Sequence, residues 1–194
     1  EEDQPKVVGL MYVALLLGMI VSALVFGALL ESYTPGRLIQ CIQGAAVVTV
    51  VLNGVALWKQ EARDRDRARR PLPEESFAEA WRELSRAPGA ARLLMMVGFG
   101  TLGFGMADVL LEPYGGQVLG MTVAQTTLLT AALAGGTLFG FGLASRVLLR
   151  GGDPARLAMA GAAVGVPAFG AIIAASALHS PALFAGAVAV AGFG

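Results

Sequence analysis

Residues 7–30 of the chain read VVGLMYVALLLGMIVSALVFGALL, a run of 24 residues without a charged side chain. About 20 apolar residues are enough for a helix to cross the hydrocarbon core of a bilayer. Lipid offers no hydrogen-bonding partner to the backbone, so a spanning segment is helical or belongs to a closed barrel. The alternation of period two that marks a barrel strand is absent here. We therefore predict a transmembrane helix over this stretch.

Further segments share this character and predict four more spans, at 38–58, 93–111, about 126–149 and 157–178. A sixth apolar run opens at Pro181 and has only about 13 residues before the chain stops, too few to cross. The predicted fold class is therefore all-α, a polytopic transmembrane helical bundle with five full spans and the start of a sixth. The chain opens without Met, and we expect it to be an internal piece of a longer, transporter-like protein.

The composition supports a lipid environment and excludes several function classes. Hydrophobic residues make up 56% of the chain and charged residues 14%, against about 25% charged in soluble domains. Because 14 Lys+Arg balance 14 Asp+Glu, no basic surface for nucleic acid is expected. A single cysteine, Cys41, excludes an internal disulfide and suggests no metal cluster. No phosphate-binding loop, H-E-x-x-H, C-x-x-C or nucleophile motif occurs, so we predict no enzyme activity and no catalytic residue.

The basic residues predict how the helices are threaded through the membrane. If successive helices alternate in direction, thirteen of the fourteen Lys and Arg fall on one side, and only Arg37 lies opposite. By the positive-inside rule that side is cytoplasmic. It carries the N-terminal end, the connection 59–92, and Arg146, Arg150 and Arg156. The connections 31–37, 112–121 and 179–181 are then expected on the periplasmic or lumenal side.

The connection 59–92 is the one sizeable hydrophilic segment. Its first part, 59–70, could extend the second span into water, and 74–86 is predicted to form a short amphipathic helix with Phe77, Trp81 and Leu84 on one face. Two interpretations of this helix stay open. It lies at the cytoplasmic headgroup level, with its arginines near anionic lipid, or it is a solvated linker between two halves of a bundle.

Small residues recur at a spacing of four, in the pairs Ala23/Gly27, Gly136/Gly140 and Gly161/Gly165. Close approach of backbones drives helix association in lipid, and such pairs permit it. We expect them to pack helices within this chain rather than to form a dimer contact. Four further glycines crowd the third predicted span, at Gly98, Gly100, Gly103 and Gly105.

Asp108 and Glu112 are the most informative polar pair. They are four residues apart, hence on one helix face, and an acidic group at membrane depth usually faces protein or water. One hypothesis has the pair handling protons or a polar ligand. The other has Asp108 hydrogen-bonded to a neighbouring helix and Glu112 solvated. Gln40 and Gln43 could join Asp108 in a polar pocket or make interhelical hydrogen bonds.

His179 is the only histidine of the chain and is expected in an outer connection. Its imidazole could ligate a chlorin magnesium, or it could simply be solvated.

Three stretches carry a resemblance to a known family. They are EEDQPKVVGLMY at 1–12, DVLLEPYGG at 108–116 and GMTVAQTT at 120–127. They resemble the PucC/LhaA family, the bacteriochlorophyll-synthase-like group of the major facilitator superfamily. Pro113, Tyr114, Gly115 and Gly116 are candidate site residues because they match the family string, as Asp108 and Glu112 do.

The resemblance implies a major-facilitator fold of twelve helices, with the spans of this chain as helices five to nine and the start of ten. Residues 1–58 would then end the N-terminal half, 59–92 would be the cytoplasmic central loop, and 93–194 would begin the C-terminal half. GLASR at 142–146, followed by Arg150 and Arg156, resembles the cytoplasmic loop motif of the superfamily. Ser145 stands where that motif usually has an acidic residue.

The function implied by the resemblance is assembly of light-harvesting antenna complexes in the intracytoplasmic photosynthetic membrane of a bacterium. Antenna α and β polypeptides or a reaction-centre–antenna complex would be the partners, within the lipid bilayer. Bacteriochlorophyll, and as a second pigment carotenoid, would be the candidate cofactors. A different hypothesis remains open: a proton-coupled transporter of small molecules or pigment, in which Asp108 titrates.

Overall fold

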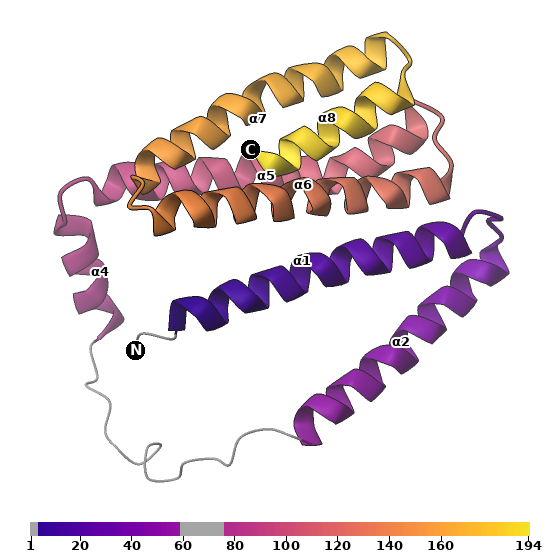
Figure 1. Ribbon diagram of the computed structural model, residues 1–194, viewed down its shortest axis with the longest axis horizontal. Helices are drawn as coiled ribbons and strands as arrows, with labels where there is room; N and C mark the ends of the chain where they lie inside the picture. Colours follow the sequence, from indigo (N-terminus) through magenta and orange to yellow (C-terminus); the bar gives the residue numbers. More distant parts are fainter. Residues whose placement is uncertain (1–3, 59–75) are drawn as a thin grey trace. The chain divides into compact units, whose positions relative to one another are not determined.

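The computed structural model describes residues 4–58 and 76–194, and its regular elements are all helices. Five are long and apolar enough to cross a membrane: α1 (Gln4–Leu29), α2 (Pro35–Trp58), α5 (Ala90–Gln117), α6 (Val123–Leu149) and α7 (Pro154–Ala177) (Figure 1). Two are shorter, α4 (Phe77–Arg86) and α8 (Pro181–Phe193). The predicted all-α class is confirmed, with five helices of spanning length and a sixth apolar helix of 13 residues.

The helix bounds agree with the predicted spans except at one end. The proposed extension of the second span over 59–70, and the first two residues of the predicted helix 74–86, lie outside the described residues. The outer connection predicted from residue 112 is wrong, because α5 continues through Pro113 to Gln117. A proline removes one helical hydrogen bond but does not force the chain out of a helix. The next turn closes normally, since the Val118 amide donates to the Tyr114 carbonyl at 2.9 Å.

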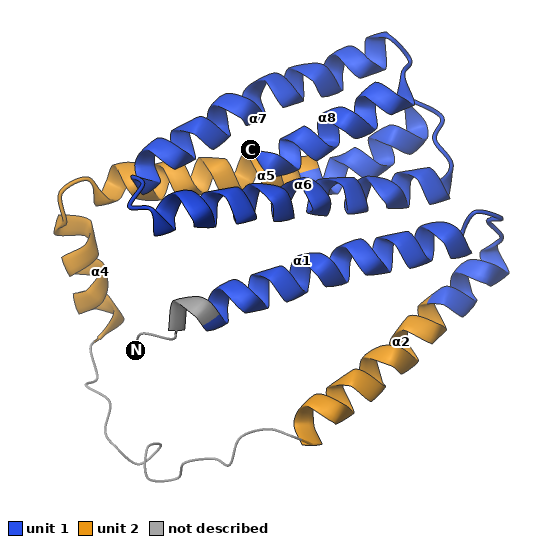
Figure 2. Ribbon diagram, in the orientation of Figure 1, with its two compact units in different colours: residues 1–41, 108–194 blue, residues 42–107 orange. Residues whose placement is uncertain are grey.

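The described chain divides into two compact units, residues 1–41 with 108–194, and residues 42–107 (Figure 2). In the first unit α6 packs against α1 and α8, and α8 also packs against α7. Its core is small, and the largest fully buried side chains are those of Leu129, Phe184 and Val188. The second unit holds the rest of α2, α4 and the first part of α5, whose side chains are nearly all exposed.

Backbone contact between α6 and α8 is the closest helix approach in the first unit. A Cβ atom built on Gly140 would lie 2.6 Å from the carbonyl oxygen of Phe193. One on Gly136 would meet the backbone of Ala189, and one on Gly192 the backbone of Leu133. Real Cβ atoms do not come this near to backbone oxygens, so only glycine fits at these three positions. The Gly136/Gly140 pair therefore packs one helix on another inside the chain, as predicted.

The other two small-residue pairs are also contacts within the first unit. On α1, Ala23 is buried, and a Cβ on Gly27 would lie 3.1 Å from Leu128 Cδ2 of α6. On α7, Gly161 and Gly165 face the backbone of Gly194. The four glycines at 98–105 differ: within their own unit nothing lies within 4 Å of a Cβ built on them. These four glycines therefore make no close helix contact inside that unit.

The threading within the first unit follows the predicted alternation. Gly27 near the end of α1 meets Leu128 near the start of α6. Tyr12 near the start of α1 and Phe141 near the end of α6 have ring centroids 6.3 Å apart, so these helices run in opposite directions. Arg146 and Arg150 lie at that same end, where α6 leads into α7. In α5, Arg92 and Glu112 are 20 residues apart, about 30 Å along one continuous helix. The predicted orientation, with the basic end of α5 on the cytoplasmic side, stays a prediction from the sequence.

The glycine contact makes a direct prediction, for which adjacent residues supply a matched pair. Gly136→Ala should lower the free energy of unfolding in detergent by about 1–3 kcal/mol, because the new methyl group overlaps the Ala189 backbone. Gly135→Ala should be neutral or slightly stabilising, because a Cβ at Gly135 meets nothing within 4 Å. Denaturation midpoints of the two variants in one detergent measure the difference. Equal midpoints would contradict this account of the α6–α8 contact.

Candidate functional site

The family-like string at 108–116 forms the last turns of α5 and contacts two other helices. The carboxylate of Glu112 accepts a hydrogen bond from the Thr130 hydroxyl of α6. The ring of Tyr114 stacks on Phe184 of α8, with centroids 5.8 Å apart. A Cβ on Gly115 would lie 3.2 Å from Leu129 Cδ1, so a larger residue would press on α6. The string thus fastens the end of α5 to α6 and α8.

Helical spacing explains which positions of the string point inward. Residues 108, 111, 112 and 115 share one face of α5, because they are three and four apart. Leu111 and Gly115 on this face are buried, while Asp108 and Glu112 beside them are exposed. The buried positions provide the packing, and the acidic positions border the packed region.

A small cleft lies beside the two carboxylates. Its walls come from α5, α6 and α8, namely Asp108, Leu111, Glu112, Leu129, Thr130, Leu133 and Val188. Its volume is about 10 Å³, room for about one water molecule. Such a cleft can hold a water or pass a proton between the carboxylates, and it is too small for an organic solute. Among the described residues no group of three or more His, Cys, Asp or Glu could hold a metal ion.

The arrangement of the acidic pair differs from the structural alternative made from the sequence, and the hypothesis that the pair handles protons or a polar ligand stays a prediction. The structural alternative had Asp108 hydrogen-bonded and Glu112 solvated, whereas Glu112 is the residue bonded to a neighbouring helix. Thr130 was the signal that sequence reasoning missed, a hydroxyl on an apolar segment. Asp108 forms part of the cleft wall and makes no hydrogen bond or ion pair with the described residues.

The polar residues of α2 do not line this cleft. Gln40 and Gln43 are exposed on α2. Asn53 satisfies its side chain inside its own helix, where Nδ2 donates to the Thr49 carbonyl at 2.9 Å. A polar pocket that combines the two glutamines with Asp108 therefore remains a prediction from the sequence.

His179 forms the turn between α7 and α8. Its φ of 48° is the only positive value at a non-glycine residue in the described chain. Its amide donates to the Ser176 carbonyl and that of Ser180 to the Ala175 carbonyl, both at 3.0 Å, which is the usual way for a left-handed residue to close a helix. Ser180 then caps α8, because its hydroxyl accepts from the Leu183 amide. The imidazole is exposed and the backbone role alone accounts for this position.

The predicted cytoplasmic loop residues surround a second tight turn. Arg150 ends α6, and Asp153 caps α7 by accepting the Ala155 amide at 2.9 Å. Arg156 pairs with Asp153 at 3.6 Å on the surface, a contact of at most about 1 kcal/mol. Arg146 is exposed one turn earlier. Ser145 stands where the superfamily motif usually has an acidic residue. Its hydroxyl donates to the Phe141 carbonyl of its own helix.

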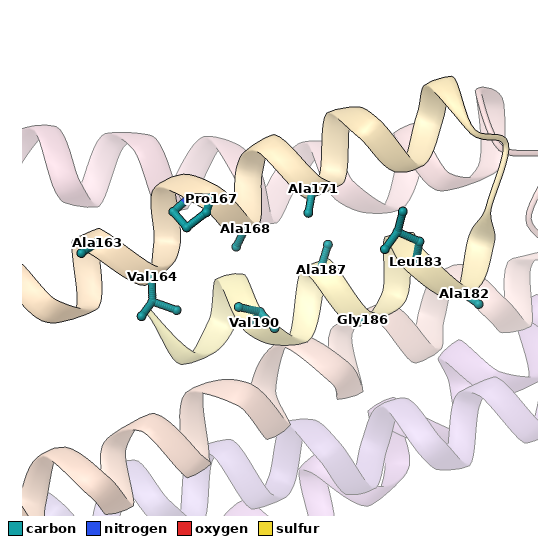
Figure 3. Close-up of a pocket in the computed structure, with 10 residues that line it drawn as sticks. All are labelled: Ala163, Val164, Pro167, Ala168, Ala171, Ala182, Leu183, Gly186, Ala187 and Val190. Atoms are coloured by element: carbon teal, nitrogen blue, oxygen red, sulfur yellow. The ribbon is translucent and has the colours of Figure 1, made fainter.

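An apolar groove of about 580 Å³ is lined by residues of α7 and α8, beside the contact between these two helices (Figure 3). Alanine, valine, leucine, glycine and proline make up its whole lining: Ala163, Val164, Pro167, Ala168, Ala171, Ala182, Leu183, Gly186, Ala187 and Val190. The groove can take hydrocarbon, and no side chain in it can ligate a metal ion. His179 is not part of the lining. Sequence reasoning missed this groove, because small apolar residues on a spanning helix look the same whether or not they are in contact.

Comparison with known proteins gives a family match over the whole chain. The family model described as PUCC protein matches residues 1–194. Protein PucC of Rhodovulum sulfidophilum is 61% identical, over 100% of this chain and 43% of its own length. Protein PucC of Rhodobacter capsulatus is 62% identical, over 89% of this chain and 38% of its own. A protein named bacteriochlorophyll synthase 44.5 kDa chain, also from Rhodobacter capsulatus, is 30% identical over 66% of this chain and 30% of its own.

The chain therefore spans about two fifths of the length of the PucC proteins that it matches. No solved structure gives a significant match.

The Glu112–Thr130 hydrogen bond can be tested by a double-mutant cycle. Thr130→Val and Glu112→Gln should each lower the free energy of unfolding by about 0.5–2 kcal/mol, because each weakens a charged interhelical hydrogen bond. The free energy of unfolding of the double variant should fall by less than the sum of the two single losses. Thr127→Val is the matched control on α6, since the Thr127 hydroxyl donates only to the Val123 carbonyl of its own helix. Additive losses would mean that the two side chains do not interact.

Proposed function

The chain belongs to the PUCC protein family, and on that premise we propose that it acts in the assembly of bacterial light-harvesting antenna complexes, by binding antenna polypeptides within the membrane. The observation that carries the proposal is the family match across residues 1–194, together with 61% identity to a PucC protein. The relative named as a bacteriochlorophyll synthase chain supports a connection with the pigment. The reaction-centre–antenna complex is the second candidate partner, and the intracytoplasmic photosynthetic membrane is the expected location.

The physical requirements of such a role match the character of the helices. A partner helix dissolved in lipid gains little from hydrophobic burial, so it needs surfaces where backbones can approach. The chain has five apolar helices of spanning length, and among the described residues no polar or charged side chain is buried. Binding of helices by helices needs no polar site. A role without enzyme activity is consistent with these observations.

Pigment delivery is the second, separable part of the proposal. The groove between α7 and α8 suits the hydrocarbon part of a bacteriochlorophyll or a carotenoid, because its lining is apolar throughout. It offers no ligand for the chlorin magnesium, so the described residues fit only part of bacteriochlorophyll.

The transporter hypothesis lacks a supporting observation. Coupled transport needs a cavity for the solute near the titrating group. The cleft at Asp108 holds about one water molecule. If Asp108 nevertheless couples protons to uptake, Asp108→Asn should abolish proton-driven uptake of solute in vesicles.

An inventory of the native complex tests the proposed function. Protein purified from photosynthetic membranes in mild detergent should carry antenna polypeptides, identified by mass spectrometry, and bacteriochlorophyll, measured by absorbance. The physical reason is that partner helices held by lateral packing stay bound while the lipid environment is retained. Colourless protein without antenna polypeptides would refute the proposal. Protein that carries antenna polypeptides but no pigment would support the assembly role and refute pigment delivery.

A substitution at His179 separates pigment ligation from its role in the turn. His179→Gly removes the imidazole and suits a φ of 48°, so stability should rise by about 0.5–1 kcal/mol. If His179 has only the turn role, the pigment content of the purified complex should not change. His179→Ala is the control, which lacks the imidazole and keeps the strained backbone. Loss of pigment in both variants would instead identify His179 as a ligand.

A further inference from the structure

Helix α4 is short but carries its own start and stop signals. The Ser76 amide donates to the Glu79 carboxylate at 3.3 Å, and the Ala87 amide closes the last turn on the Glu83 carbonyl at 3.2 Å. At ten residues, however, α4 is shorter than the roughly 12–15 residues that an isolated helix needs to be stable in water. Something beyond its own hydrogen bonds must stabilise it.

The apolar residues of α4 lie on a single face. Phe77, Ala80, Trp81 and Leu84 fall within about 100° of the helix circumference, since they are three and four apart. The rings of Phe77 and Trp81 stack with centroids 6.3 Å apart. Phe77 is 82% exposed, Trp81 52% and Leu84 44%. Large apolar side chains thus form a continuous exposed strip, and the charged residues of α4 lie on the other side.

The connection to α5 keeps this strip at the membrane. α4 ends at Arg86 and α5, a helix of spanning length, begins at Ala90. The four Cα–Cα steps from Arg86 to Ala90 reach about 14 Å at most. The headgroup layer on each side of the hydrocarbon core is about 5–8 Å thick. The end of α4 is therefore tethered within about two layer thicknesses of the level at which α5 starts, close to the membrane surface.

The local backbone directs α4 across α5 rather than along it. Gly89 has a φ of 83°, and Figure 1 shows α4 turning away from the direction of the first part of α5. If α5 crosses the bilayer, a helix placed crosswise to it lies along the surface.

The charges of α4 indicate which kind of surface it meets. Glu79 and Glu83 balance Arg82 and Arg86, so attraction to anionic lipid is weak. Phe and Trp are side chains that favour the boundary between headgroups and acyl chains. The hydrophobic face, rather than net charge, would hold the helix there.

We propose that α4 is an interfacial helix whose face of Phe77, Ala80, Trp81 and Leu84 lies in the headgroup–acyl boundary of the bilayer that α5 crosses. Of the two interpretations of this helix that the sequence left open, the proposal selects the one at the membrane surface over the solvated linker. It also predicts that attachment depends little on anionic lipid. The proposal does not depend on the proposed function, because it concerns the protein alone in lipid.

Tryptophan quenching tests the location of α4 in the full-length protein. Trp58, and any other tryptophan, is replaced by Phe so that Trp81 is the only emitter. The protein is reconstituted in vesicles of phosphatidylcholine, or of an equal mixture with phosphatidylglycerol, with and without bromine-labelled acyl chains. We expect roughly twofold or greater quenching by brominated lipid in both compositions, and little quenching by aqueous acrylamide.

The control moves the indole to the polar face of the same helix. With Trp81→Phe and Arg86→Trp combined, quenching by brominated lipid should fall and acrylamide quenching should rise. In the protein with Trp81 as its only tryptophan, Leu84→Glu should also reduce quenching by brominated lipid. Ala78→Glu, outside the apolar face, should preserve this quenching and so show that the fold tolerates a new charge.

Other outcomes overturn the proposal. Quenching of Trp81 by acrylamide and not by brominated lipid would mean a solvated linker. Protection from both quenchers would mean that protein covers the strip. Quenching by brominated lipid only in the anionic vesicles would contradict hydrophobic anchoring.

Discussion

The close backbone approach of α6 and α8 is the contact on which the rest of the larger unit depends. Lipid removes the hydrophobic drive between helices, so their association relies on van der Waals contact at short range. Glycines at 136, 140 and 192 make that contact possible, because any side chain there would meet a carbonyl oxygen. α8 is thereby fixed against α6, and it offers its other side to α7. α1 uses another face of α6, where Gly27 meets Leu128.

The end of α5 is attached to this core by the same residues that carry the family resemblance. Glu112, Tyr114 and Gly115 contact α6, α8 or both, which gives three residues of the string a packing role. Pro113 is accommodated within the helix. The carboxylate of Glu112 is thus an acceptor between helices, and Asp108 lies in the wall of the small cleft.

The surfaces of the chain suit the handling of other apolar molecules more than the chemistry of a polar site. The groove beside α7 and α8 is apolar throughout, and the cleft at Asp108 holds about one water molecule. A membrane assembly factor needs faces for helices and hydrocarbon, and neither requires aligned acids, bases or metal ligands. Family membership carries the functional proposal, and the geometry explains how such a protein could act without a catalytic centre.

Segment length and apolar composition were enough to predict five helices of spanning length, because lipid permits few backbone structures. The spacing of the small residues was enough to predict their contacts within the first unit. These sequence features could not show that α5 continues past Pro113, because proline is a common end of a helix and the contacts of Tyr114 and Gly115 with α6 and α8 come from distant segments. Nor could they show that Glu112 rather than Asp108 is bonded, since the donor, Thr130, is 18 residues away. The left-handed turn at His179 and the groove beside α8 likewise depend on how two helices meet. The length and hydropathy that let a helix cross the bilayer belong to each segment alone. Which residues contact one another depends on distances between segments, and only the packed chain sets these distances.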